Sequence, residues 1–211
     1  MSIYIVYLSP TSVTVGVDTE GRREDGSAVS VSKAIPLVHM NAIIAYRGSA
    51  LFLSILFICC HQQGGEFDAL VDRMPGIIQE TQVAARQAAQ TLGITDQSIL
   101  DKHDIVLAGW SSLAGRMVAY KWSVENGDTE ATQRRSVNTW ICGPWDASLP
   151  EPIPHRGTED MIRMASAQVR LLHEKEPKAS AGGRLIVAHI TRKGMHIASV
   201  ADLPTRSGDT A

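Results

Sequence analysis

The stretch SIYIVYLSPTSVTVGVD, residues 2–18, decides the fold of this chain. Residues 3–8 are rich in β-branched and aromatic side chains, Ser9-Pro10-Thr11 supplies turn residues, and residues 12–17 alternate Ser, Val, Thr, Val, Gly and Val. Runs of this kind on either side of a turn favour a β-hairpin. The chain is therefore predicted to begin with a hairpin, and Asp18 follows directly after its second strand.

Outward from this hairpin, apolar runs bounded by turn residues predict further strands. They cover residues 29–37, 42–46, 104–110, 116–124, 136–142, 185–190 and 195–200. Asn126-Gly127 is a strong tight-turn signal after the fourth of these runs. Arg192-Lys193-Gly194 predicts a hairpin that joins the last two.

Three segments are candidates for helices. Residues 49–63 fit either a buried strand or a buried helix, and their length favours the helix. Residues 66–92 have helical spacing, which Pro75-Gly76 interrupts before it resumes, and Gly93 is a plausible C-cap. A third helix is predicted from Thr158 as N-cap, with one apolar face formed by Met161, Met164, Ala165, Gln168 and Leu172.

Length and composition indicate one globular domain. The chain has 211 residues, 44% of them hydrophobic, which suits a single sizeable core. We expect the domain to span residues 1–203 and the small polar tail, residues 204–211, to be disordered. The order strands, two helices, strands, helix, strands fits two sheets packed face to face with helices outside, although the pattern also permits a generic α+β fold.

Charge and cysteine content narrow the possible partners and the compartment. The net charge of −2 gives no electrostatic reason to expect binding to nucleic acid or to an anionic membrane. Three cysteines cannot form a disulfide framework, and the longest apolar stretch is too short to span a bilayer. We therefore expect a cytoplasmic protein. We also expect no cofactor, because the sequence contains no complete metal-ligand spacing and no phosphate-binding glycine loop.

The second residue is a candidate nucleophile. Methionine aminopeptidases remove Met1 before a small residue, which would expose Ser2 with a free α-amino group. That amine has an ordinary pKa near 8. It can therefore serve as a general base for its own hydroxyl near neutral pH.

Four short motifs in the first fifty residues carry a family resemblance. They are Ser2-Ile3-Tyr4-Ile5-Val6, Val13-Thr14-Val15-Gly16-Val17-Asp18-Thr19, Ser32-Lys33-Ala34-Ile35 and Ala45-Tyr46-Arg47-Gly48-Ser49-Ala50. In order and spacing they resemble the proteasome β-subunit family of N-terminal-nucleophile hydrolases and its bacterial relatives, with Lys33 one residue short of the pattern. The resemblance continues through residues 105–110 and 182–194, and covers about residues 2–200. It implies a four-layer αββα sandwich.

The same resemblance implies a catalytic role for four residues. Ser2 would be the nucleophile, Lys33 an ammonium beside it, and Asp18 the carboxylate that holds Lys33 charged and oriented. The backbone N–H of Gly48 would be the oxyanion donor at the start of a helix. Two departures weaken the match: Pro144 replaces a supporting hydroxyl after residues 142–143, and no Asp precedes Ser180 in register.

Two functions follow from this resemblance. One is a proteasome-like peptidase subunit of the threonine/serine type, which hydrolyses peptide bonds in peptides or unfolded proteins. The other is a catalytically inactive protein that keeps the fold for assembly. In both cases we expect a homo-oligomer, most simply a ring, because the run from residue 50 to residue 60 is unusually apolar. The resemblance leaves room for an ATPase partner but does not identify one.

Overall fold

The computed structural model describes residues 2–22, 27–94, 96, 100–125, 134–176 and 180–205. Its strands are β1 (Tyr4–Leu8), β2 (Ser12–Asp18), β3 (Glu20–Arg22), β4 (Ala28–Ser30), β5 (Ala34–Leu37), β6 (Ala42–Arg47), β7 (His103–Ser111), β8 (Arg116–Val124), β9 (Arg135–Ser136), β10 (Trp140–Gly143), β11 (Arg184–Thr191) and β12 (Gly194–Asp202). Its helices are α1 (Ala50–Gln62), α2 (Phe67–Thr91) and α3 (Thr158–Lys175), with short 3-10 turns η1 (Val38–Met40) and η3 (Pro154–Arg156). The predicted Asn126-Gly127 turn lies outside the described residues.

The first sheet contains the amino-terminal hairpin. Its strand order is β10-β1-β2-β11-β12, and every neighbouring pair is antiparallel. β1 pairs with β2 from Tyr4 opposite Val17 to Leu8 opposite Val13, which confirms the predicted hairpin. The predicted hairpin at the end of the chain is also confirmed, as β11 and β12.

The second sheet has the order β5-β6-β7-β8-β9, and β3 pairs with β4 in a separate ribbon. The single strand predicted over residues 136–142 is instead divided between the two sheets. β9 pairs with β8 in the second sheet, whereas β10 pairs with β1 in the first. Val137, which is buried with the residues between the sheets, lies at this crossing. The sequence of residues 136–142 does not reveal such a change of sheet, because both halves are suited to a strand.

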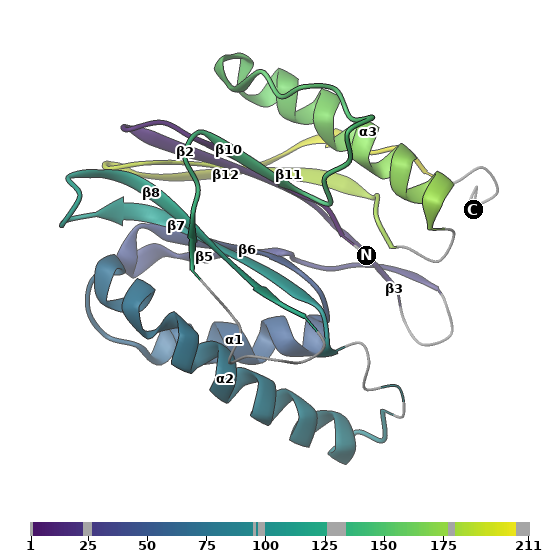
Figure 1. Cartoon of the computed structure of the whole chain (residues 1–211). Coiled ribbons are helices and arrows are strands. Elements are labelled where there is room, and N and C mark those ends of the chain that lie inside the picture. Colours follow the sequence, from purple (N-terminus) through teal and green to yellow (C-terminus); the bar gives the residue numbers. More distant parts are fainter. Residues whose placement is uncertain are drawn as a thin grey trace.

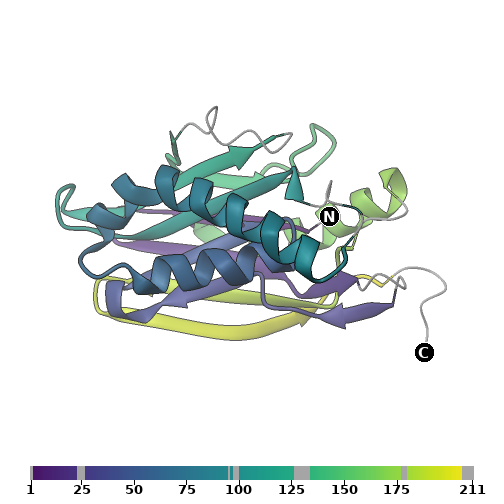
Figure 2. The ribbon, with the colours of Figure 1, turned by 90° about the horizontal axis from the view of Figure 1, so that it is seen from below.

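The first two helices lie side by side on the outer face of the second sheet (Figure 2). The segment predicted as either a buried strand or a buried helix forms the helix α1, as its length favoured. α2 runs without a break through Pro75, so the predicted interruption is wrong. Pro75 and Gly76 are exposed, while Met74 and Ile77 on either side are buried. Packing of this apolar face therefore holds the helix together across the proline. Gly93 has a φ of +72° just after the helix, as a C-cap glycine does.

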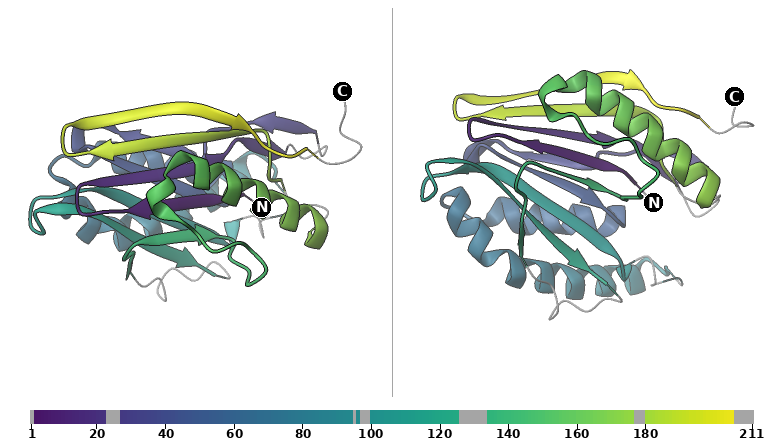
Figure 3. Two further views of the ribbon diagram at one scale, coloured as in Figure 1. Left: turned by 90° about the horizontal axis from the view of Figure 1, so that it is seen from above. Right: turned by 45° about the horizontal axis from the view of Figure 1, so that its top comes forward.

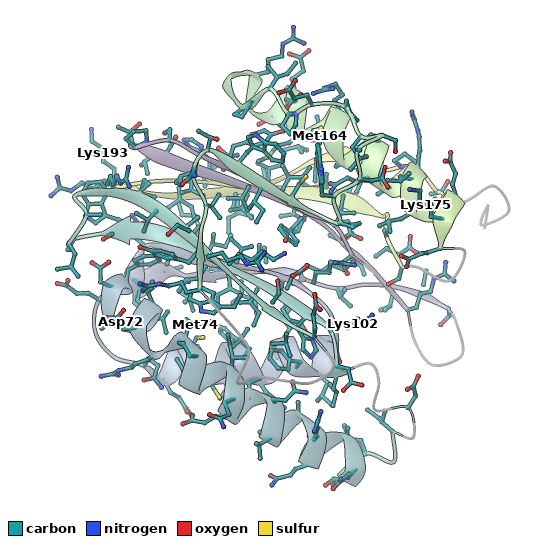
Figure 4. All side chains as sticks on the ribbon, viewed as in Figure 1. Asp72, Met74, Lys102, Met164, Lys175 and Lys193 are labelled. Carbon is teal, nitrogen blue, oxygen red and sulfur yellow. The ribbon has the colours of Figure 1, made fainter. Side chains whose placement is uncertain are left out.

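Three clusters of buried side chains separate the layers seen in Figure 1. One lies between α1, α2 and the second sheet, one between the two sheets, and one between the first sheet and α3. Met74 and Met164 are fully buried members of the first and third clusters and lie on the sheet-facing sides of α2 and α3 (Figure 4). The predicted apolar face of α3 is confirmed, although Gly157 and not Thr158 is the N-cap.

The fold class implied by the resemblance, a four-layer αββα sandwich of the N-terminal-nucleophile hydrolase type, is wrong for this chain. The described residues are mainly antiparallel strands with three helices, and α3 is the one described helix that lies on the first sheet. The β11–β12 hairpin extends beyond α3 in Figure 3, and β12 has no buried residue. Among residues 134–176 and 180–205, which the structure describes, no second α-helix lies on this hairpin.

The boundaries of the domain stay a prediction. Residues 206–211 of the expected tail lie outside the described part of the chain. None of the described helices combines the length and the apolar composition needed to cross a membrane.

Candidate active site

The site begins where β1 and β2 meet at the amino-terminal end of the chain. Because Tyr4 pairs with Val17, the residues before Tyr4 lie beside the end of β2. The backbone N–H of Ile3 donates to Oδ1 of Asp18 at 3.0 Å, which ties the chain one residue after Ser2 to this carboxylate. Ser2 itself is 4% exposed, and Met1 lies outside the described residues.

Lys33 reaches Asp18 from the other sheet. Its Nζ atom lies 2.7 Å from Oδ2 of Asp18 and also donates to the backbone carbonyl of Glu20. Lys33 directly precedes β5, and its own carbonyl accepts from the N–H of Tyr46 on β6 at 2.9 Å. The ion pair therefore links the end of β2 in the first sheet to the edge of the second.

Burial acts on the charges of this pair. Asp18 is fully buried and Lys33 is 5% exposed. Desolvation raises the pKa of Asp18 and lowers the pKa of Lys33, while the attraction between the two groups opposes both shifts. A lysine whose pKa is lowered can give up and regain a proton more readily than an exposed lysine. The arrangement is suited to proton transfer next to the start of the chain.

A third segment completes the surroundings of Asp18. The backbone N–H of Gly182 donates to Oδ2 of Asp18 at 3.1 Å, and the Gly182 carbonyl accepts from the N–H groups of Thr19 and Glu20. Gly182 and Gly183 have φ values of +148° and +71°, and a Cβ on Gly183 would lie 2.7 Å from Oγ1 of Thr19. This contact was missed by the sequence analysis, where the adjacent glycines before the last hairpin were the available signal.

Gly48 lies on the connection between β6 and α1. It has a φ of +149°, and a Cβ there would lie 2.4 Å from both the Tyr46 hydroxyl and Nδ1 of His103. It is followed by Ser49, the N-cap of α1, where the N–H groups of the first turn carry the positive end of the helix dipole. Position 48 therefore requires glycine, at a helix end suited to a developing negative charge.

The structure brings together some of the predicted residues. Asp18 and Lys33 are in direct contact, and Ile3 places Ser2 beside them. Within the part of the chain that the structure describes, the Ser2 hydroxyl forms no hydrogen bond with Lys33 or with Gly48. The catalytic roles of the four residues therefore stay predictions.

Pro144 occupies its position through contacts with α3. Its carbonyl accepts from Nε2 of Gln168 at 2.9 Å. A Cβ on the preceding Gly143 would lie 2.5 Å from the Tyr4 ring, so this turn packs tightly on β1. The turn supplies backbone contacts here and no hydroxyl group. Residues 177–179, where the second departure from the family pattern begins, lie outside the described residues.

A further group of charges between the sheets was also missed. Asp104 on β7 accepts from Arg47 at 3.1 Å, from Lys121 at 2.8 Å and from the Ser123 hydroxyl at 2.7 Å. Burial raises the pKa of Asp104, but these donors outweigh it and the net shift is downward. Lys121 also lies 5.7 Å from the centre of the Tyr4 ring. Charged residues within otherwise apolar strands were the signal that could have revealed this group.

The fold of this chain is similar to that of two solved structures. The solved structures that resemble it include the Gly-1 mutant of Anbu from Hyphomicrobium sp. strain MC1, with a TM-score of 0.63 and 9% identity over 99% of this chain and 89% of that one. They also include Anbu, described as an ancestral beta-subunit, from Yersinia bercovieri, with a TM-score of 0.60 and 8% identity over 93% and 87% of the two chains. No protein-family model and no curated protein matches the sequence.

These neighbours correct the family resemblance. The motifs suggested the proteasome β-subunit family, whereas both of these similar structures are Anbu proteins, a distinct proteasome-like family. The mainly antiparallel sheets and three helices of the described residues match the fold of the first of these structures with a TM-score of 0.63, and not the αββα sandwich. At 8–9% identity the likeness establishes the fold alone. The motifs around Asp18 and Lys33 concern one local site. They contain little information about the helices that cover the outer faces of the sheets, so they could not distinguish the two families.

Proposed function

We propose that this chain hydrolyses amide bonds, with Ser2 as an amino-terminal nucleophile after removal of Met1. The observation that carries the proposal is the buried Lys33–Asp18 ion pair, 2.7 Å between Nζ and Oδ2, next to the first strand. A buried ion pair is costly to desolvate and is weak evidence for stability, so chemistry is a better reason for placing it there. The fold similarity to Anbu, described as an ancestral beta-subunit, supports the same proposal.

Each step of the reaction has a group to perform it. The free α-amino group of Ser2 takes the proton from its own hydroxyl, and Oγ attacks the carbonyl carbon of the substrate. The N–H of Gly48 donates to the negative oxygen of the tetrahedral intermediate. The resulting α-ammonium gives its proton to the departing amine, which leaves an acyl ester on Ser2. Water, deprotonated by the same amine, then hydrolyses the ester.

Lys33 and Asp18 support this cycle without forming a bond to the substrate. The positive charge of Lys33 lowers the pKa of the neighbouring Ser2 hydroxyl. Asp18 keeps Lys33 charged and, through the N–H of Ile3, holds the chain start in place. The substrate class is peptides or unfolded protein segments.

The alternative is a catalytically inactive assembly protein. Pro144 favours it, because the turn beside β1 offers no hydroxyl to support the nucleophile. Both functions include self-association. Ile58 on α1 is 52% exposed and Val83 on α2 is 54% exposed, so these two helices present apolar side chains that a second copy could cover.

Covalent labelling distinguishes the two functions. A peptide epoxyketone reacts with both the hydroxyl and the free amine of an amino-terminal serine, and the adduct is located by mass spectrometry of intact and digested protein. We expect labelling at Ser2 in protein without Met1, and none in Lys33→Ala. Lys193→Ala is the matched control, since this exposed lysine lies on the β11–β12 turn, at the opposite end of the structure from the chain start (Figures 1 and 4). Absence of labelling in wild-type protein lacking Met1 favours the assembly protein.

A further inference from the structure

A row of polar side chains crosses three strands of the second sheet at the end next to Gly48. Arg47, the last residue of β6, is in register with Asp104 on β7, which is in register with Ser123 on β8. Nη1 of Arg47 lies 3.1 Å from Oδ2 of Asp104, and the Ser123 hydroxyl donates to Oδ1 at 2.7 Å. Nζ of Lys121 lies 2.8 Å from the same Oδ1. One carboxylate therefore joins the ends of three strands.

This row reaches the peptide that contains the Gly48 N–H, because that peptide begins with Arg47. The N–H of Tyr46 donates to the Lys33 carbonyl at 2.9 Å, so the polar backbone groups of Tyr46 face β5. Backbone groups of successive residues in a strand face opposite neighbours, so the carbonyl of Arg47 faces Asp104 on β7. The carbonyl and the N–H of a trans peptide point in opposite directions. The Gly48 N–H is therefore directed away from β7, toward the edge where Lys33 lies.

The Gly48 N–H is an available donor at this edge. The described chain places no strand residue opposite it, because the chain before Lys33 turns away and the N–H of Val31 donates to the Thr19 carbonyl at 2.8 Å. Across the described ranges of the chain, no oxygen accepts a hydrogen bond from the Gly48 N–H. The donor can therefore bind an oxygen atom of a substrate on the side where Lys33 lies.

The side chains of the row strengthen the backbone pairing that holds this peptide. Arg47 and Asp104 form the last pair of the β6–β7 ladder, and the ends of a ladder open more readily than its middle. The ion pair joins the same two residues, so this end cannot open without separating a guanidinium from a carboxylate. The two side chains are 23% and 12% exposed, and this partial shielding strengthens their attraction relative to a surface pair.

We propose that Asp104 is a positioning residue, which acts through Arg47 to fix the peptide whose N–H binds the oxyanion of the reaction. The inference rests on the proposed function and adds to its site a residue outside the family motifs. A donor that is fixed before reaction stabilises the transition state without reorganising, and a displacement of about 1 Å can cost about 100-fold in rate.

Asp104→Asn tests the inference, because it keeps the size of the side chain and removes its charge. We expect kcat for a fluorogenic peptide amide to fall about 10- to 100-fold while KM stays within about twofold, since the fixed donor is needed in the transition state. Asp101→Asn is the matched control. Asp101 forms an exposed ion pair with Arg86 at 3.4 Å, and its substitution should leave both constants unchanged.

A spectroscopic measurement distinguishes positioning from a general loss of structure. A peptide boronate forms a tetrahedral adduct with the Ser2 hydroxyl, and the Gly48 amide proton moves downfield in the NMR spectrum when this N–H donates to an oxygen of the adduct. We expect this downfield movement in wild type and in Asp101→Asn, and a smaller one in Asp104→Asn.

The outcomes separate this inference from the proposed function. A wild-type protein without Met1 that shows neither turnover nor adduct overturns both. If the wild type turns over and Asp104→Asn matches Asp101→Asn in kcat and in the Gly48 resonance, the positioning inference alone is overturned. A raised KM with unchanged kcat overturns it as well, because the residue would then act in substrate binding.

A second variant applies if Asp104→Asn does not fold. Arg47→Met breaks the same ion pair and leaves Asp104 with its donors Lys121 and Ser123. We expect the same loss of kcat and the same smaller movement of the Gly48 resonance. An Arg47→Met enzyme with wild-type kcat contradicts the inference.

Discussion

Two buried polar pairs in this protein, Asp18–Lys33 and Tyr46–His103, differ in charge. Asp18 and Lys33 form an ion pair that takes further hydrogen bonds from Ile3 and Gly182. Tyr46 and His103 are both neutral near pH 7, since burial raises the pKa of the tyrosine and lowers that of the histidine. Burial is similar in the two pairs, but in the first the attraction between opposite charges opposes the effect of desolvation on both pKa values.

The comparison teaches what each pair can do. Three donors converge on Asp18 from different parts of the chain, which compensates for the loss of water around a carboxylate. Such a pair can respond to a proton moving nearby. In the neutral pair, the Tyr46 hydroxyl lies 2.5 Å from Nδ1 of His103, and Nε2 of His103 lies 2.7 Å from the Leu100 carbonyl, so the pair holds geometry only. A substitution should therefore have a larger effect on stability in the charged pair than in the neutral one.

The largest effect is expected for Asp18→Asn. The change leaves the Lys33 ammonium buried without its counter-ion and removes one acceptor from the backbone donors of Ile3 and Gly182. Loss of one partner from a buried ion pair costs about 3–5 kcal/mol of unfolding free energy. Urea titration at pH 7 measures it, and labelling of Ser2 should be lost as well.

A second substitution sharpens this result. Adding Lys33→Met to Asp18→Asn removes the unpaired ammonium, so we expect about half of the lost stability to return while labelling stays absent. If the double variant is no more stable than Asp18→Asn alone, the cost arises from the backbone donors and not from the charge.

Gly48→Ala comes next, with an expected loss of about 3 kcal/mol. A Cβ at this position meets Tyr46 and His103 at 2.4 Å, and the φ of +149° is unfavourable for alanine. Thermal and urea unfolding measure the change. Gly76→Ala is the matched control, because that glycine lies exposed within α2 with open space around it, and it should stabilise the protein by about 0.5–1 kcal/mol. Equal effects at the two glycines would contradict the tight packing at Gly48.

Acidification should lower the unfolding free energy of the protein through His103, by less than the substitutions above do. The pKa of His103 falls from its ordinary value of 6.5 to about 4, because burial outweighs the attraction of Asp101 and Asp104. Between these values the unfolded chain binds a proton that the folded protein does not, so stability falls as the pH falls. For this one group we expect about 2 kcal/mol less stability at pH 5 than at pH 7.

His103→Gln separates this effect from other titrating groups. The variant should lose about 2 kcal/mol of the pH dependence between pH 5 and pH 7, measured as urea midpoints, whereas exposed His196→Gln should keep it. A pH dependence that is the same in wild type and His103→Gln would show that the ring is protonated in the folded protein at pH 5.

The sequence was sufficient for elements fixed by local patterns. The alternation in residues 12–17 predicted β2, and the spacing of Met161, Met164 and Ala165 predicted the buried face of α3. It was insufficient where tertiary packing decides. α2 passes through Pro75, and the strand predicted over residues 136–142 changes sheet, because contacts with distant elements outweigh local preference.

The contacts of the candidate site were likewise predictable only in part. The family resemblance implied that Asp18 and Lys33 lie together, and their side chains are 2.7 Å apart. Gly182 and His103 were missed because their partners are far along the chain and neither residue belongs to a short motif. The family was misassigned because the motifs describe the neighbourhood of Asp18 and not the covering of the sheets.

The hydrogen bond from Gly182 to Asp18 spans 164 residues of sequence, and this has a consequence for protein synthesis. A ribosome that adds about 5–20 residues per second needs on the order of 10–30 s to travel from one residue to the other. For most of that interval the emerging chain has Ser2, Asp18 and Lys33 but lacks one of the donors that hold the carboxylate. The surroundings of Asp18 are therefore complete only after Gly182, just before the last hairpin, has been translated. Under the proposed function, Ser2 of a growing chain lacks this support until then.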